Sequence, residues 1–202
     1  MTPTKVADTK TRILDAAEKL FGENGFDATS LRDITAEADV NLAAVNYHFQ
    51  SKDSLIDAVI ARRVEPVNRK RIELLEAAGD NPSVEQLLIA FLSPIMNKDL
   101  AISYPLMARV LATPDAFVTR LFKQHLGVIV ERFTDAFSKA LPELSRKGVM
   151  WRMHFAAGAM AHVLSRAQVM PELMPEGNFD PQTTLAELVT FAAAGFRAKE
   201  GI

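Results

Sequence analysis

The chain has 202 residues, 49% of them hydrophobic and 24% charged, and its formal net charge is −2. This length suits one large domain or two small ones that share a core, and so high a hydrophobic fraction excludes a disordered chain. The sequence contains no cysteine, which excludes disulfides, thiolate nucleophiles and thiolate-bound zinc or iron–sulfur clusters. The slightly acidic balance gives no support to nucleic-acid binding, which usually coincides with a basic patch.

The histidines and the apolar segments exclude further classes of protein. No H-E-x-x-H or other metal-ligand spacing occurs among His48, His125, His154 and His162. We therefore expect no catalytic site, no metal and no cofactor. The segment MTPTKVADTKTR lacks the apolar core of a signal peptide, and no apolar run reaches the roughly 18 residues of a membrane helix. We expect a cytoplasmic protein without membrane contacts.

The first predicted elements are an amphipathic helix and a short second helix. Apolar residues recur at helical spacing over residues 13–21, which places them on one helix face. Thr29 or Ser30 can cap a short helix over residues 31–38, and Asp33 completes a capping box with Ser30. The tripeptide Asp39-Val40-Asn41 predicts a tight turn, after which a third helix follows over residues 42–49.

Further helices are predicted along the rest of the chain. Ser51 can cap a long helix from Lys52, in which Pro66 predicts a kink or break. Thr113-Pro114 and Asp180-Pro181 each combine a capping residue with proline at the first helical position. The other helices are predicted at about 84–96, 104–112, 115–141, 146–169 and 180–198. Because no stretch alternates with the period of a strand, the fold class is all-α, with about nine helices.

Two short helices joined by a tight turn and supported by a preceding helix are typical of a DNA-binding helix-turn-helix. We expect a DNA-binding domain over residues 1–50 and a ligand-binding and dimerisation domain over residues 51–202. The residues predicted to face the core are Leu31, Ile34, Ala38, Val40, Val45 and Phe49. Those predicted to point outward on the second short helix are Leu42, Ala43, Asn46 and Tyr47.

The outward side chains define the predicted contacts with double-stranded DNA. Asn46 can bind adenine with two hydrogen bonds, whereas Leu42 and Ala43 can touch thymine methyl groups. Phosphate contacts are expected from Thr29, Arg32, Tyr47, His48 and Lys52.

The segment TSLRDITAEADVNLAAVNYHFQSKDSL, residues 29–55, resembles the signature of the TetR family of transcriptional repressors. The usual form of that signature is T-T-x-R-x-I-A-x-x-A-G-V-S-x-x-x-L-Y-x-H-F-x-S-K-x-x-L. This chain departs from it at Asp39, Asn41, Val45 and Asn46, where the family has glycine, serine, leucine and tyrosine. The resemblance implies a DNA-binding repressor. Because the family position of Asn46 often contacts DNA, the operator sequence cannot be carried over.

The C-terminal part is rich in large, flexible apolar residues, which form either a core or an adaptable ligand cavity. The predicted lining residues are Met96, Met107, Leu111 and Phe122. Three further groups, Arg109, Arg152 and His154, are candidate partners of a ligand carboxylate. The alternative for the arginines is an internal ion pair, with Glu131 or Asp135 as acid.

Two segments rich in small residues, 156–161 and 191–196, are too apolar to lie exposed, so we expect a homodimer through the last two helices. A two-fold dimer requires a roughly palindromic operator.

The C-terminal part also resembles the PsrA-like, fatty-acid-responsive branch of the family. The matching stretches are 41–49, 107–111, 150–159 and 192–198. That resemblance implies a long-chain fatty acid or its acyl-CoA as an effector that releases the operator. The alternatives are an all-helical enzyme acting on an acyl substrate, with Glu131 and His125 or His154 as an acid–base pair, or a helical adaptor that only dimerises. No G-x-S-x-G motif or phosphate-binding loop supports the enzyme.

Overall fold

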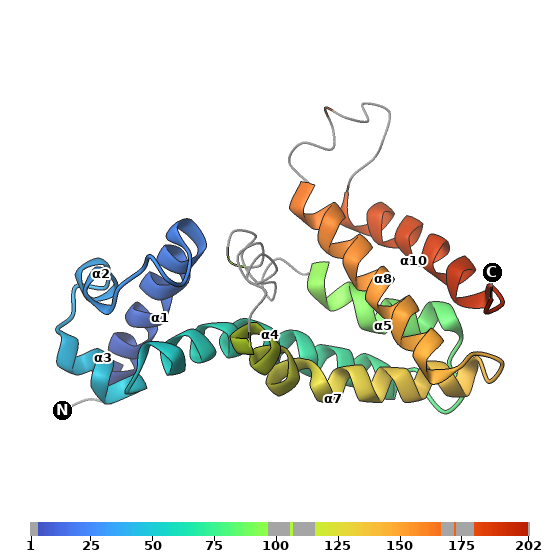
Figure 1. Ribbon diagram of the computed structural model, residues 1–202, viewed down its shortest axis with the longest axis horizontal. Coiled ribbons are helices and arrows are strands. Elements are labelled where there is room, and N and C mark those ends of the chain that lie inside the picture. Colours follow the sequence, from blue (N-terminus) through green and yellow to red (C-terminus); the bar gives the residue numbers. More distant parts are fainter. Residues whose placement is uncertain (1–3, 97–105, 107–115, 167–171, 173–179, 202) are drawn as a thin grey trace. The chain divides into compact units, whose positions relative to one another are not determined.

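The computed structural model describes residues 4–96, 106, 116–166, 172 and 180–201. Within these residues the chain forms eight helices and no strand, which confirms the all-α class. The helix expected at 104–112 and the Thr113-Pro114 cap lie outside the described residues. The helices are α1 (Thr4–Asn24), α2 (Leu31–Glu37), α3 (Leu42–Phe49), α4 (Lys52–Ala77), α5 (Val84–Met96), α7 (Ala116–Ala140), α8 (Arg146–Arg166) and α10 (Pro181–Arg197) (Figure 1).

The chain divides into two compact units. The N-terminal unit comprises Met1–Glu65 and Ile102–Lys123, and the C-terminal unit comprises Pro66–Ala101 and Gln124–Ile202. The N-terminal unit therefore continues beyond the boundary expected at residue 50, because the first half of α4 packs into it. Helix α4 passes from one unit to the other between Glu65 and Pro66.

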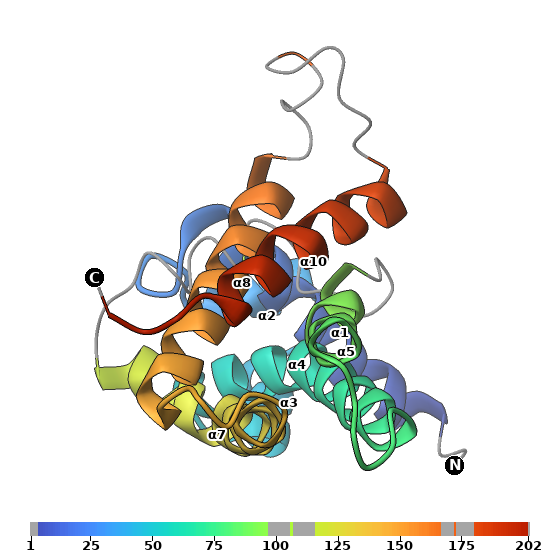
Figure 2. The ribbon, with the colours of Figure 1, turned by 90° about the vertical axis from the view of Figure 1, so that its right-hand side faces the viewer.

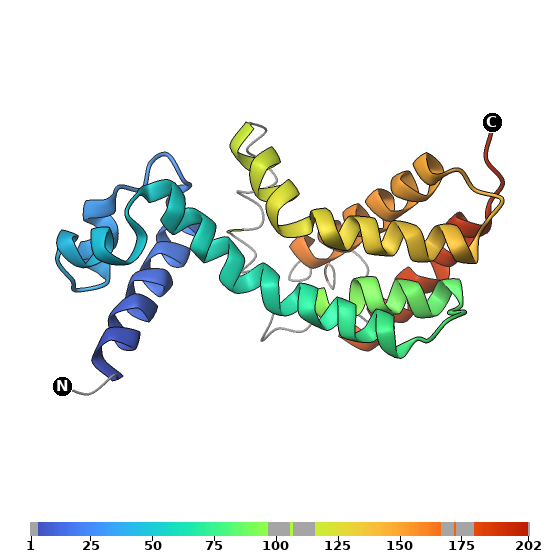
Figure 3. The same cartoon turned by 90° about the horizontal axis from the view of Figure 1, so that it is seen from below.

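In the N-terminal unit, α1, α2 and α3 gather around the first half of α4 (Figure 3). Its core consists of fully buried apolar side chains, among them Ile13, Phe21, Ile34, Val45 and Leu55. Burial of one such side chain stabilises the fold by about 1.5–3 kcal/mol, so this core holds the short helices α2 and α3 in place.

The predicted caps explain where the short helices begin. The backbone N–H of Asp33 donates to the Ser30 hydroxyl at 3.2 Å, and the Ser30 backbone N–H donates to the Asp33 carboxylate at 2.8 Å. Acceptance of hydrogen bonds from the Ser30 hydroxyl and backbone lowers the pKa of Asp33. Asn41 caps α3 by accepting from the Ala44 N–H at 2.9 Å, and Ser51 caps α4 by accepting from the Ser54 N–H at 3.1 Å. The capping predictions at these three starts are confirmed.

Ion pairs fasten α4 to α1. Arg63 donates from Nε to both oxygens of Glu18, at 3.0 and 2.9 Å, and Arg62 pairs with Asp15. Glu18 is only 7% exposed, so the bidentate contact with Arg63 is a largely buried link between the two helices. Pro66 removes one backbone donor, yet α4 continues through it to Ala77. Pro66 therefore does not end the helix, and a kink there stays a prediction.

The C-terminal unit is a bundle in which α10 packs against α5 and α8 (Figure 2). Aromatic pairs fill its core: Phe91 and Phe133 have ring centroids 5.1 Å apart, and Phe137 stacks on Phe196 at 4.4 Å. The Asp180 carboxylate accepts from the backbone N–H groups of Gln182 and Thr183 at the start of α10, as predicted from Asp180-Pro181. Of the two interpretations of the large apolar residues in the C-terminal part, a core or a ligand cavity, the core is therefore correct for Phe91 and Phe133.

Candidate nucleic-acid interface

The turn between α2 and α3 is fixed by an unusual backbone conformation and by an arginine from α1. Asp39 has a φ of 50°, in the left-handed region that aspartate tolerates better than most residues. Arg12 donates from Nη2 to the carbonyls of Ala38 and Asp39 at 2.6 and 2.8 Å, and to the Asp39 carboxylate at 3.3 Å. Arg12 thus closes the end of α2 and sets the direction in which the chain enters α3. The sequence alone does not indicate this role of Arg12.

Helix α3 buries one face and exposes the other. Val45 and Phe49 are buried, at 1% and 5% exposure, whereas Tyr47 is 79% and Leu42 is 43% exposed. Asn46 and Ala43 are exposed as well. The predicted inward and outward faces of α3 are therefore confirmed, while Leu31 and Val40 are half-buried rather than in the core.

The side chains expected to contact phosphates differ in their exposure and in their hydrogen-bond partners. Arg32 is exposed and has no side-chain partner among the described residues. Lys52 is half-buried and donates to the Asp27 carbonyl over a long 3.4 Å. The half-buried His48 ring lies edge-on to the Tyr47 ring, with centroids 5.1 Å apart.

Thr29 takes a different position from the one expected. Its side chain is 1% exposed, and its hydroxyl donates toward the carbonyls of Gly25 and Leu20 at 2.8 and 3.1 Å. A hydroxyl held inside in this way cannot reach a phosphate. Thr29 joins the end of α1 to the start of α2, and its phosphate assignment is corrected.

Internal ion pairs engage several cations of the N-terminal unit. Lys19 pairs with Glu37 at 2.7 Å, which raises the pKa of Lys19. Arg12, Arg62 and Arg63 are likewise bound to acids of the same unit. These four cations are bound to acids of their own unit, whereas Arg32 at the start of α2 is exposed.

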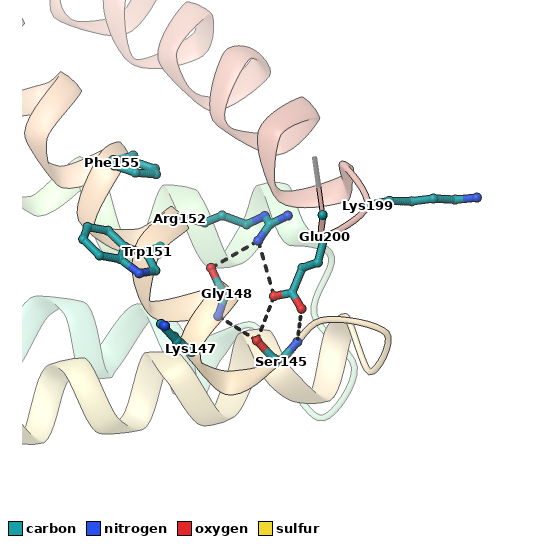
Figure 4. A pocket seen from close by; sticks show the side chains of 9 residues that line it. Ser145, Lys147, Gly148, Trp151, Arg152, Phe155, Lys199 and Glu200 are labelled. Carbon is teal, nitrogen blue, oxygen red and sulfur yellow. Dashed lines mark hydrogen bonds and ion pairs between the residues drawn. The ribbon is translucent and has the colours of Figure 1, made fainter.

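In the C-terminal unit, Arg152 is engaged internally. Its guanidinium donates to the carbonyls of Gly195, Ala198 and Gly148 at 3.0, 2.8 and 3.2 Å. Its Nη1 also lies 3.8 Å from the Glu200 carboxylate, which accepts from the Ser145 hydroxyl and N–H (Figure 4). The internal alternative for Arg152 is therefore correct, with Glu200 as its acid. Asp135 pairs with Arg146 instead, and Glu131 is exposed.

The remaining predicted ligand residues fall into two groups. His154 is exposed on α8, edge-on to Trp151, with centroids 5.9 Å apart, and Met96 packs half-buried against the core. The second group lies outside the part of the chain that the structure describes: Met107, Arg109, Leu111 and the side chain of Phe122. The hollow beside Arg152, about 490 Å³ in volume, is at the surface and is lined by Trp151, Phe155, Lys147 and Lys199 among others.

Arg71 of α4 is a charged residue that sequence analysis missed. It is only 6% exposed, although an isolated arginine rarely lies in a core. A signal was present in the sequence, because Val67, Arg71 and Leu75 follow one another at four-residue spacing and so share a helix face.

No group of three or more potential metal ligands occurs among the residues that the structure describes. Within the same residues, no helix is both long and apolar enough to cross a membrane. The arrangement as a whole is that of a helix-turn-helix protein with a helical C-terminal body.

Comparisons with known proteins agree with this class. Residues 13–59 match the domain family described as "Bacterial regulatory proteins, tetR family", and residues 90–195 match "Tetracyclin repressor-like, C-terminal domain". Because the second match alone spans more than half of the chain, the chain belongs to the TetR family of transcriptional regulators. These are regulators rather than enzymes, which speaks against the acyl-substrate enzyme.

Individual relatives extend the comparison. The transcriptional repressor KstR2 of Rhodococcus jostii is 30% identical over 95 residues, or 44% of this chain. The aligned part spans 47% of KstR2, just under half its length. Salmonella enterica GusR has a TM-score of 0.68 at 22% identity, with 98% of each chain covered. The fatty acid degradation regulator FadR of Bacillus halodurans has a TM-score of 0.62 at 15% identity, over 93% of this chain and 99% of FadR. Both structural likenesses concern the fold.

Proposed function

We propose that this chain is a dimeric repressor that binds a palindromic operator through α3 and releases it when the C-terminal unit binds a small apolar effector. The observation that carries the proposal is the exposed face of α3 in a helix-turn-helix whose two short helices are capped. Asn46 lies on that face beside the exposed Ala43 and Leu42. An amide side chain there can bind adenine, and the two apolar side chains can contact thymine methyls.

Phosphate contacts on either side of α3 would position it in the major groove. Arg32 at the start of α2, Lys52 at the start of α4 and the highly exposed Tyr47 are the proposed contacts. His48 is a further candidate, although its ring is half-buried. Such contacts fix orientation without reading sequence.

The proposed dimer forms through α8 and α10. Phe191 of α10 is 74% exposed, and Phe155 and Trp151 of α8, whose rings stack, are 64% and 51% exposed. Large exposed apolar side chains on two helices that pack together are typical of an interface. At Gly158 and Gly195, on the same two helices, an added Cβ would have no atom within 4 Å apart from the adjacent residues and the backbone of its own helix. That open space would allow close approach of a partner helix.

The proposed effector is a long-chain fatty acid or its acyl-CoA. This rests on the resemblance to fatty-acid-responsive regulators and on the fold shared with FadR. In the proposed mechanism, the effector binds better to a conformation in which α4, hinged near Pro66, moves the recognition helices off their half-sites. An effector can shift this equilibrium only by its differential affinity, typically about 1–3 kcal/mol.

Two variants test DNA recognition. Asn46→Ala should relax preference at one base position by about 1–3 kcal/mol, whereas Lys52→Ala should weaken binding to all DNA alike and reduce the salt slope by about 1. Fluorescence anisotropy on a palindromic site from the protein's own promoter and on random DNA, across a salt series, measures both. Equal losses on the two DNAs for Asn46→Ala would remove Asn46 from base recognition. Absence of any retention at low salt would reject the repressor in favour of a helical adaptor.

A further inference from the structure

Among the residues that the structure describes, one buried cation of the C-terminal unit has only neutral partners. Arg71 donates from Nε to the Phe91 carbonyl at 2.8 Å and from Nη1 to the Asn68 side-chain oxygen at 3.2 Å. Its guanidinium carbon lies 4.8 Å from the centroid of the Phe91 ring. No carboxylate of the described residues forms an ion pair with it. Arg71 therefore differs from Arg63 and Arg152, each of which has an acid beside it.

An uncompensated charge in this position is costly. A buried ion loses its hydration, and neutral acceptors replace only part of it. Burial lowers the pKa of the Arg71 guanidinium to about 10, so the surroundings disfavour the charged form, which still prevails at neutral pH. An anion bound at this point would offset that cost.

The donors that remain suit a carboxylate. A guanidinium carries five N–H groups, and the described residues accept only from Nε and Nη1. Nη2 has no acceptor among them, and it forms with Nη1 the planar fork that binds a carboxylate with two parallel hydrogen bonds.

The surroundings of Arg71 are apolar. The Phe91 ring, which lies against the Arg71 guanidinium, packs on the fully buried Phe133. A small inorganic anion would gain nothing from these side chains, whereas an anion with a hydrocarbon body would. Asn68 also donates to the His125 carbonyl at 2.6 Å, so Arg71 lies where α4 is joined to α7.

We infer that Arg71 binds the carboxylate of the effector, and that the effector is a free, apolar carboxylic acid rather than its thioester. This inference rests on the proposed function and narrows it. Arg152, held by carbonyls and Glu200, and the exposed His154 are not needed for this role. Arg109 stays a prediction.

The test compares Arg71→Met with Arg69→Met, a control at an exposed arginine of the same helix. Binding of oleate, oleyl alcohol and oleoyl-CoA is measured by calorimetry and by thermal shift. Wild type and Arg69→Met should bind oleate more tightly than the alcohol or the thioester. Arg71→Met should bind oleate about ten- to a hundredfold more weakly, the loss expected for hydrogen bonds to a charged group. Its binding of the alcohol should not change.

The stability of the ligand-free protein separates binding from a structural role. A cation without an acid is a cost, so Arg71→Met should unfold at the same temperature as wild type or higher, and should keep operator binding. If Arg71 only bonds the Phe91 carbonyl near Pro94 of α5, Arg71→Met should instead unfold earlier. Arg71→Gln, which keeps a donor but no charge, would then regain both stability and oleate binding.

Other results would overturn either the role inferred for Arg71 or the proposed function. Unchanged oleate affinity in Arg71→Met or Arg71→Gln overturns the inference, as does preference of the wild type for oleoyl-CoA or for the alcohol. Wild type that binds operator DNA but none of the three lipids overturns it while leaving the repressor intact. Failure to bind operator DNA, with oleate binding as described, would reject the proposed function instead.

Discussion

Replacement of Phe191 by alanine tests the proposed dimer directly. Phe191 is 74% exposed on α10, and full burial of a phenylalanine contributes about 1.5–3 kcal/mol. If a partner covers the exposed three-quarters, each copy loses about 1.5 kcal/mol on truncation. A two-fold interface contains the residue twice, so the dimer should lose about 3 kcal/mol, or roughly a hundredfold in dissociation constant.

Sedimentation equilibrium over a concentration series measures that constant. Phe191→Ala should shift the monomer–dimer transition to higher concentration while the far-UV circular dichroism spectrum stays that of wild type, because the side chain supports no core contact. Val128→Ala is the matched control, since Val128 is 68% exposed on α7, outside the proposed interface. Equal dissociation constants for wild type and Phe191→Ala, or a weaker dimer for Val128→Ala, would refute the assignment of the interface to α8 and α10.

Three further substitutions test the helix-turn-helix. Thr29→Val removes a buried hydroxyl from two carbonyls and should cost about 1–2 kcal/mol in urea unfolding; an unchanged midpoint would contradict this role. Asp39→Asn keeps a residue that tolerates positive φ but removes a negative charge, so anisotropy should show tighter binding to specific and random DNA alike, with the melting temperature preserved. Asp33 has a lowered pKa, so its contribution is complete above its ordinary pKa and is lost as pH falls through the lower folded value. The melting-temperature difference between wild type and Asp33→Asn should therefore shrink between about pH 5 and pH 2. A difference that stays constant over this range would show that the negative charge of Asp33 does not contribute to stability.

Local chemistry made the helix starts predictable from the sequence. A capping side chain and the backbone N–H that donates to it lie two or three residues apart, as at Ser30, Asn41 and Asp180, so a short window contains the whole interaction. The faces of α3 were predictable for the same reason, because helical periodicity alone places Val45 inside and Asn46 outside.

Contacts between distant segments were not predictable in this way. For Arg152 the sequence suggested an ion pair with Glu131 or Asp135, yet the acid beside it is Glu200, beyond the end of α10. Thr29 matched a signature position, but whether its hydroxyl points to solvent depends on the carbonyls that end α1. The role of Arg12 likewise requires α1 to lie beside the turn at Asp39. In each case the deciding partner is set by tertiary packing.

The placement of Arg71 gives the proposed switch a physical basis. Arg71 follows shortly after Pro66 on α4, the helix that belongs to both units, and the first half of that helix is tied to α1 by Arg62 and Arg63. A carboxylate that binds Arg71 would thus act on the helix that supports the DNA-binding unit, through covalent continuity alone. Linkage then requires that operator DNA weaken oleate binding by the same factor by which oleate weakens operator binding, about 5- to 150-fold for typical coupling. Oleate titrations with and without saturating operator measure that factor, and equal affinities in both would show that Arg71 binds a ligand without controlling DNA release.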